Sequence, residues 1–387
     1  MKRRLHAVVS AFAPWEFGGG AERVAWSEAH RIAERDAVVF VHTGATPPPD
    51  AVPTARIGGW LRRLHDPRTG ARSAAGRLLF HALLPFNPVV FAEALAAFRL
   101  LRPGIVHTHN LVGLSPSVWL AARLAGARVV HTHHDLSLFC QRATMTRRDG
   151  YPCEERTAIC VACRATRPFK RAQTPLLARE LFPSRWLRDR LGRSGDVVRP
   201  FAEAKAPAPT RPPAGFSALY VGRLTPSKGV TVLLDAVARA GVPLVVAGDG
   251  PLESAIRAAE GVTYVGYADD HKRAMLLAEA SVVVVPSIAP ESAGRVFYEA
   301  VVACVPTILS DRGGLTELAE LGSSVLVPPG DAQALADALA ALAADPARLE
   351  ELRRAALAHR DEVSPERFKR EIERALDAAT AGATTSG

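Results

Sequence analysis

The chain contains 387 residues, of which 48% are hydrophobic and 22% are charged. This length exceeds what one ordinary hydrophobic core organises, so we expect two domains of roughly 200 residues or fewer each. A membrane-spanning helix needs about 18 or more consecutive apolar residues, and no such run without charges occurs. These features exclude an evident transmembrane helix, and we expect a cytoplasmic protein.

The net charge of +9 is unevenly distributed along the chain. Residues 1–200 hold 30 Lys and Arg against 15 Asp and Glu, whereas the remainder holds 18 against 24. A basic half indicates an anionic membrane surface, an anionic acceptor or nucleic acid as partner, although a solvated arginine-rich surface has the same composition. Aromatic residues make up only 6% and do not alternate with the basic ones, so we expect no nucleic-acid partner.

Apolar stretches in the N-terminal half predict strands at residues 5–12, 37–42, 105–108 and 127–132. Three glycines at 18–20 lie between the first two stretches and precede a helical pattern. Glycines at a strand-to-helix turn let a ligand approach the backbone closely, although such a triplet is more often only a flexible loop.

Basic and apolar residues alternate irregularly after Trp60, with Arg68, Arg72 and Arg77 leading into the apolar run 78–86. This composition is typical of a segment that rests on an anionic membrane surface. We therefore expect peripheral contact at the inner membrane face, although the pattern is not a clean amphipathic helix.

Histidines follow two predicted strands, at His107 and His109 and again at 131, 133 and 134, where Asp135 comes next. A histidine at such a place is most often a structural hydrogen-bonding group, and five within 28 residues also permit a metal site. Both interpretations remain open from the pattern alone.

Four of the five cysteines are concentrated in residues 140–163. Four thiols within 24 residues, ending in Cys-Val-Ala-Cys, match the ligand count of a tetrahedral structural zinc site. An iron–sulfur cluster, two disulfides or four unligated thiols are the alternatives. The residues of this predicted zinc site are Cys140, Cys153, Cys160 and Cys163.

Residues 199–215 contain five prolines among small residues, which rules out an interior helix or strand and predicts an interdomain linker. After it, apolar strand patterns alternate regularly with helical ones as far as Ser364-Pro365, where a last helix begins. Such alternation predicts an α/β domain with a parallel sheet. The predicted strands are 217–221, 242–247, 263–266, 282–286, 307–310 and 325–327.

Three strand-to-turn motifs in the C-terminal half carry groups suited to a nucleotide sugar. Arg223 and Lys228 follow the first strand, the turn Gly-Asp-Gly with Gly250 follows the second, and Glu291 and Glu299 follow the strand 282–286. The carboxyl ends of parallel strands meet at one edge of a sheet, where nucleotides bind. Cations there suit a diphosphate, and carboxylates about two helical turns apart suit sugar hydroxyls.

Together these motifs resemble the donor domain of the retaining, GT-B-fold glycosyltransferases of family four, also called glycosyl transferases group 1. The resemblance extends from the glycine-rich start to about residue 331 and implies two Rossmann-like domains facing a deep cleft. It implies that Arg223 and Lys228 hold the diphosphate, that Glu291 faces the sugar, and that Glu299 binds the ribose. The remaining donor-site positions that it implies are Gly19, Gly20, Gly250, Gly294, Arg295 and Val296.

The resemblance also places His109 near the anomeric carbon and His134-Asp135 at the cleft wall. Some family members carry a similar cysteine-rich insertion, which supports a structural clip rather than a catalytic group. The chain departs from the family pattern at Cys304, where a small glycine is usual, and at Ser292 and Ala293, which puts donor specificity in doubt.

The implied activity is transfer of a hexosyl unit from a UDP- or GDP-sugar to an acceptor hydroxyl with retained configuration, and no cofactor is required for catalysis. A GT-B epimerase or hydrolase and a non-catalytic basic protein clipped by zinc are the alternatives. The expected parts are an acceptor-binding domain at 1–198, a linker at 199–215, a donor domain at 216–362, and at 363–387 a helix that crosses back, with a tail.

Overall fold

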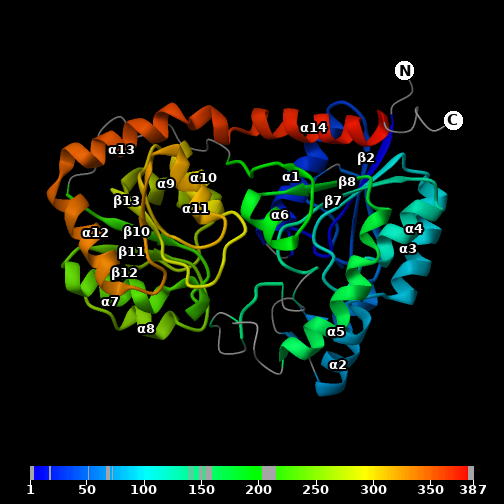
Figure 1. The fold of residues 1–387 in the computed structure, drawn as a ribbon, viewed down its shortest axis with the longest axis horizontal. Coiled ribbons are helices and arrows are strands. Elements are labelled where there is room, and N and C mark those ends of the chain that lie inside the picture. Colours follow the sequence, from blue (N-terminus) through cyan, green and yellow to red (C-terminus); the bar gives the residue numbers. More distant parts are fainter. Residues whose placement is uncertain are drawn as a thin grey trace.

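The protein consists of two α/β domains that lie side by side, as the computed structural model in Figure 1 shows. Each domain is built on one parallel sheet, which confirms the predicted fold class of two Rossmann-like domains. The structure describes residues 4–16, 19–50, 52–66, 70–71, 73–138, 140, 143–147, 151, 153, 159–202 and 215–381.

The N-terminal sheet has seven parallel strands in the order β3-β2-β1-β6-β7-β8-β9. Its central strands are short, nearly continuous apolar runs because helices cover both faces of the sheet. The four strands predicted in this half are all present, and the strands at 54–56, 179–182 and 196–197 were not predicted. The strands are β1 (Leu5–Val9), β2 (Ala37–His42), β3 (Thr54–Arg56), β6 (Ile105–Thr108), β7 (Arg128–Thr132), β8 (Arg179–Phe182) and β9 (Asp196–Val197).

Six helices and a small hairpin complete the described part of this domain. Three of these helices start at side-chain caps, where Ser73, Asn87 and Ser184 accept hydrogen bonds from backbone N–H groups of the first turn. The helices are α1 (Gly20–Ala33), α2 (Ala74–Leu83), α3 (Pro88–Leu101), α4 (Ser117–Leu124), α5 (Ile159–Arg171) and α6 (Arg185–Leu191), and the hairpin joins β4 (His65–Asp66) to β5 (Gly70–Ala71).

The C-terminal sheet has six parallel strands in the order β12-β11-β10-β13-β14-β15, and every strand predicted in this half is present. The strands are β10 (Ala218–Val221), β11 (Leu244–Ala247), β12 (Val262–Tyr264), β13 (Val282–Val285), β14 (Thr307–Ser310) and β15 (Ser324–Val327). The helices are α7 (Val230–Ala240), α8 (Glu253–Arg257), α9 (Asp270–Glu279), α10 (Arg295–Val302), α11 (Leu315–Leu318), α12 (Ala332–Ala344) and α13 (Pro346–Ala358).

The last helix, α14 (Pro365–Ala381), runs along the top of Figure 1 towards the N-terminal domain. Its apolar face, which includes Phe368, Ile372 and Leu376, is buried in one cluster with Val8 and Ile105 of the N-terminal sheet. The chain therefore crosses between the domains a second time. Residues 203–214 of the predicted linker lie outside the described residues.

Within the described residues, every single helix is too short or too polar to span a membrane. Helices α2 and α3 together have enough length and apolar character, but they meet at a bend of 54°.

Candidate active site

The turn between β10 and α7 brings Lys228 against Glu291. Gly229 permits this turn because its φ is +70° and an added Cβ would lie only 1.8 Å from the backbone oxygen of Pro286. The Nζ of Lys228 pairs with Oε1 of Glu291, and the hydroxyl of Ser287 donates to the same oxygen at 2.5 Å. The predicted diphosphate cation and the predicted sugar-side carboxylate are therefore in direct contact.

The carboxyl group of Glu291 is held in its ionised form. Burial alone would raise its pKa, but Lys228 and the hydroxyl of Ser287 outweigh burial, and Arg223 adds to their effect, so the pKa lies below its ordinary value. Arg223 itself is exposed, and its backbone oxygen accepts a hydrogen bond of 2.8 Å from Tyr220. The exposed guanidinium is free to turn towards an anionic ligand at this edge.

Glu299 is on α10, one turn after Arg295, and is held by two arginines. The Nε of Arg273 on α9 lies 2.7 Å from Oε2, and the Nε of Arg295 lies 3.4 Å from Oε1. The side chain of Glu299 is only 14% exposed. Its predicted contact with ribose hydroxyls would use lone pairs that these arginines do not occupy, and it stays a prediction.

The N-terminus of α10 points towards the boundary between the domains. Gly294 precedes it with φ of +59°, and the first backbone N–H groups, those of Arg295 and Val296, lie at the positive end of the helix dipole. A Cβ added to Gly20, at the start of α1 in the other domain, would lie 3.9 Å from Cδ of Arg295. The predicted glycine loop and the predicted phosphate cradle therefore face each other.

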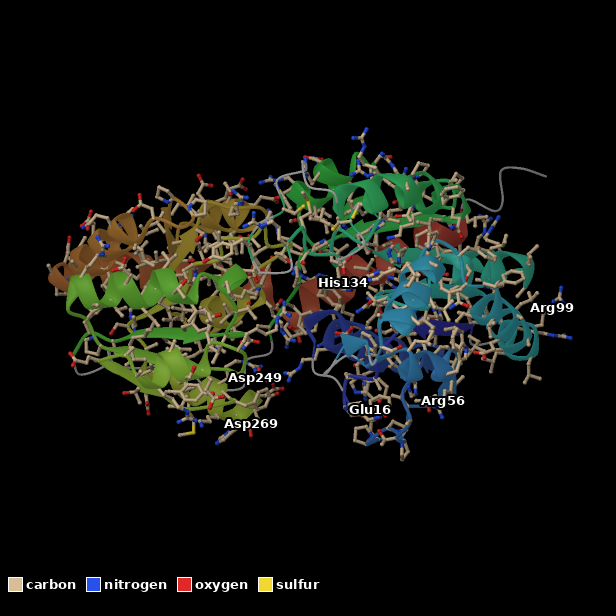
Figure 2. The ribbon with its side chains drawn as sticks, turned by 90° about the horizontal axis from the view of Figure 1, so that it is seen from below. Glu16, Arg56, Arg99, His134, Asp249 and Asp269 are labelled. Atoms are coloured by element: carbon tan, nitrogen blue, oxygen red, sulfur yellow. The ribbon has the colours of Figure 1, made fainter. Side chains whose placement is uncertain are left out.

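The turn at Gly250 belongs to the same edge of the C-terminal sheet. A Cβ added there would lie 2.6 Å from the backbone oxygen of Leu224, so this turn packs directly on the one that carries Arg223. Figure 2 shows the neighbouring Asp249 on the side of the C-terminal domain that faces the N-terminal domain. The three predicted strand-to-turn motifs thus converge on one edge.

A cavity of about 570 Å³ lies between the domains next to this edge. Its wall combines α1 of the N-terminal domain with α9 and α10 of the C-terminal domain, and Arg23 of α1 bonds Asp270 of α9 across it at 2.5 Å. Glu299 and Arg295 line this cavity, whereas Lys228 and Glu291 lie outside its lining. The cavity therefore shares Glu299 and Arg295 with the predicted site.

On the N-terminal domain, His109 is buried and His134 is half-buried. His109 is 2% exposed, and its Nδ1 lies 2.9 Å from Nε2 of His134. Figure 2 shows His134 on the side of its domain that faces the C-terminal domain. The structure therefore brings His134 nearer to the cleft than His109, and the assignment of His109 to the anomeric carbon stays a prediction.

The cysteine cluster is described in part. The sulfurs of Cys140 and Cys163 are both buried and lie 3.9 Å apart, and Lys170 donates a hydrogen bond of 2.7 Å to the backbone oxygen of Ser137 beside them. The side chain of Cys160 lies outside the described residues, so the predicted zinc site with four ligands stays a prediction.

Three contact residues of the candidate site were absent from the predictions. Ser287 lies just after β13 and four residues before Glu291. A hydroxyl at the end of a strand is a sequence signal that could have identified it. Arg273 and Arg23 come from α9 and α1, and their pairing with Glu299 and Asp270 depends on the tertiary fold.

Two family models match almost the whole chain. The model of Glycosyltransferase Family 4 matches residues 18–197, and the model of Glycosyl transferases group 1 matches residues 203–359. A phosphatidyl-myo-inositol mannosyltransferase of Mycobacterium leprae is 30% identical over 280 residues, which cover 67% of this chain and 70% of that protein. The chain belongs to the family 4, group 1 glycosyltransferases. It is therefore a sugar-transferring enzyme.

Further similarities are narrower or concern the fold alone. The putative teichuronic acid biosynthesis glycosyltransferase TuaC of Bacillus subtilis is 35% identical, over 32% of this chain and 31% of that protein. Sucrose-phosphate synthase from Thermosynechococcus elongatus superposes with a TM-score of 0.75 at 21% identity, over 98% of this chain and all of that one. HepE of Anabaena, solved in complex with UDP, gives a TM-score of 0.70 at 17% identity, over 98% and 100%. These structures confirm the GT-B fold.

Proposed function

We propose that this glycosyltransferase moves a hexosyl unit from a UDP- or GDP-sugar to an acceptor hydroxyl and retains the anomeric configuration. The contact of Lys228 with Glu291, beside the N-terminus of α10, carries the proposal. The pair offers a cation for a leaving diphosphate and a carboxylate that can accept hydrogen bonds from sugar hydroxyls, both at the same edge of the sheet. Biosynthesis of a bacterial glycan, glycolipid or glycosylated metabolite is the proposed setting.

The proposed chemistry is electrostatic. As the bond between the anomeric carbon and the diphosphate oxygen breaks, negative charge grows on the diphosphate, and Lys228, Arg223 and the N–H groups at the start of α10 would stabilise it. The departing oxygen takes the proton of the acceptor hydroxyl, which attacks from the same face, so that configuration is retained. Glu291, whose lowered pKa keeps it ionised, holds sugar hydroxyls rather than donating a proton.

Relatives guide the choice of donor. The Mycobacterium leprae relative is a mannosyltransferase by name, as is an O-antigen chain mannosyltransferase of Escherichia coli that is 32% identical over 31% of this chain. HepE has been solved with UDP-glucose as well as with UDP. Mannosyl and glucosyl donors on both nucleotides are therefore the first set to test.

The experiment is a transfer assay with these four donors and a panel of hydroxyl acceptors, with products detected by mass. Lys228→Ala should lower turnover by roughly 10²- to 10³-fold, because it removes one preorganised charge from the leaving group. Lys369→Ala is the matched control, since this partly exposed lysine of α14 pairs with Glu34 at the C-terminal end of α1 and not with Glu291. Near-normal transfer by Lys228→Ala would refute the assignment of Lys228 to the leaving diphosphate.

A further inference from the structure

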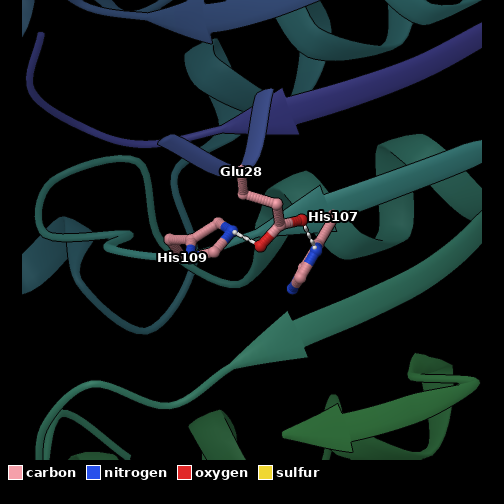
Figure 3. A group of neighbouring side chains, drawn as sticks. All are labelled: Glu28, His107 and His109. Carbon is pink, nitrogen blue, oxygen red and sulfur yellow. Dashed lines mark hydrogen bonds and ion pairs between the residues drawn. The ribbon is translucent and has the colours of Figure 1, made fainter. Parts of the chain in front are cut away.

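Glu28 is a buried carboxylate of α1 that the proposed chemistry does not use. It contacts two buried imidazoles at the end of β6, as Figure 3 shows. The Nδ1 of His107 hydrogen-bonds to Oε1 of Glu28, and Nε2 of His109 lies 3.4 Å from Oε2. Within the described residues neither Oε2 of Glu28 nor Nε2 of His109 makes a standard hydrogen bond, so the contact of 3.4 Å is what pairs these two buried atoms.

Glu28 fixes which nitrogen of His109 carries a proton. Burial opposes the charge of Glu28, but the two imidazoles outweigh burial and hold its pKa well below the ordinary value. An ionised carboxylate can only accept hydrogen bonds. Burial, with the neighbouring ring of His107, lowers the pKa of His109 and keeps it neutral at neutral pH. Its single N–H must therefore be at Nε2, which faces Glu28.

The proton on His109 in turn sets the proton on His134. The Nδ1 of His109 is left as an acceptor, and its partner at 2.9 Å is Nε2 of His134. Burial, with the ring of His109, lowers the pKa of His134 far below its ordinary value, so this ring is neutral too and must carry its N–H at Nε2. The Nδ1 of His134 is left as an acceptor on a half-buried ring at the domain boundary (Figure 2).

We propose that Glu28 is a positioning residue that acts through His109 and fixes the tautomer of His134, so that His134 offers a hydrogen-bond acceptor to a hydroxyl of a bound sugar. The inference rests on the proposed function only for the presence of that sugar. Other titratable groups near the chain of contacts are His6 on β1, Glu22 on α1, His131 and His133 around the end of β7, and Asp135. The Oε1 of Glu22 accepts from Asn110, so it does not compete for His109.

A metal ion is the competing occupant of the same cluster. Glu28, His107 and His109 bring one possible ligand atom each to within 4.8 Å of one another. A metal bound at Nε2 of His109 would move the proton of that ring to Nδ1 and reverse the hydrogen bond to His134. The Nδ1 of His134 would then carry the proton, so the tautomer of His134 separates the two occupants.

The test is the tautomer of His134, measured by imidazole ¹⁵N NMR of the full chain near neutral pH. The signal is assigned by its loss in His134→Ala among the 12 histidines. We expect Nε2 of His134 to be protonated and Nδ1 unprotonated in the wild-type protein. A proton on Nδ1 in the wild-type protein overturns the proposal, whether or not any Glu28 variant folds.

Glu28→Gln adds the second readout, because an amide can donate as well as accept. We expect a mixed His134 tautomer and a fall in kcat/KM of at least about tenfold, as when a tautomer-setting carboxylate is lost. Glu180→Gln is the matched control, since this buried carboxylate pairs with His133 and Arg193 and should leave the His134 tautomer unchanged. An unchanged tautomer in Glu28→Gln overturns the proposal. Absence of transfer by the wild-type protein refutes the proposed function instead, and the NMR result still decides this inference.

Discussion

At the residue scale, Cys304 shows how a departure from the family pattern acquires a physical meaning. The residue has φ of +55° and its side chain is buried. A residue with a Cβ pays roughly 1–2 kcal/mol for this left-handed conformation, and glycine does not. The usual glycine at this position is therefore explained by the backbone, and this chain tolerates strain just after α10.

Cys304→Gly should raise the free energy of unfolding by roughly 0.5–1 kcal/mol, because relief of the strain exceeds the added flexibility of the unfolded chain. Chemical denaturation measures it. Cys304→Ala is the control, since it removes the thiol and keeps the strain. The explanation is wrong if the glycine variant is no more stable than the alanine variant.

The histidines illustrate the limit of prediction at this scale. The sequence indicated that His109 and His134 lie at neighbouring strand ends, and the structure brings their rings to 2.9 Å. Which ring is buried depends on Glu28, which comes from a helix about 80 residues earlier and has no local signal of its own. Burial of a polar side chain by a residue far away in the chain depends on the tertiary fold, so the spacing of residues within a sequence motif cannot predict it.

At the scale of elements, the strands with continuous apolar runs were predicted closely. Residues 37–42 and 105–108 match β2 and β6 residue for residue, because a strand covered on both faces has a composition that turns do not share. Strands β3, β8 and β9 were missed. They have two to four residues each and lie towards the two edges of the sheet, and such short runs show no clear alternation of apolar and polar residues. The helix expected from Lys228 begins at Val230, after a 3₁₀ turn at Pro226–Lys228.

The cysteine-rich element carries a prediction of its own. If it binds zinc, the purified chain should contain about one zinc per molecule, since four thiolates complete one tetrahedral site. Cys140→Ser and Cys163→Ser, whose sulfurs lie 3.9 Å apart, should both lose the metal. Elemental analysis of each variant measures this.

Cys304→Ser is the control for that experiment, because Cys304 lies in the other domain and should not affect zinc content. Iron with inorganic sulfide would identify a cluster instead. Zinc retained in Cys163→Ser, or a metal-free wild-type protein, would contradict a structural zinc site.

At the scale of the whole molecule, the basic N-terminal domain ends in an apolar surface on α2 and α3. Leu78 is 74% exposed, and Leu79, Phe86 and Val89 are exposed beside it. Buried helices do not present such side chains to solvent, whereas a segment that rests on a lipid surface does. Peripheral contact with an anionic membrane stays a prediction, and this surface is where we expect it.

Leu78→Glu should weaken co-sedimentation with vesicles that contain anionic lipid by several-fold, because it replaces an apolar side chain that is 74% exposed with a charge that the lipid repels. Leu357→Glu is the control, since Leu357 is 54% exposed on α13 of the other domain. Equal sedimentation of both variants and the wild-type protein would show that this surface does not bind the membrane.

We propose that one edge of the C-terminal sheet, with Lys228, Glu291 and the N-terminus of α10, directs attack on the face from which the diphosphate departs. The anomeric configuration of the first product tests it most directly, by ¹H NMR on a reaction with the donor that the transfer assay identifies. We expect a product in which the sugar is joined to the acceptor and has the same anomeric configuration as in the donor. An inverted linkage, or free sugar as the only product, would contradict it.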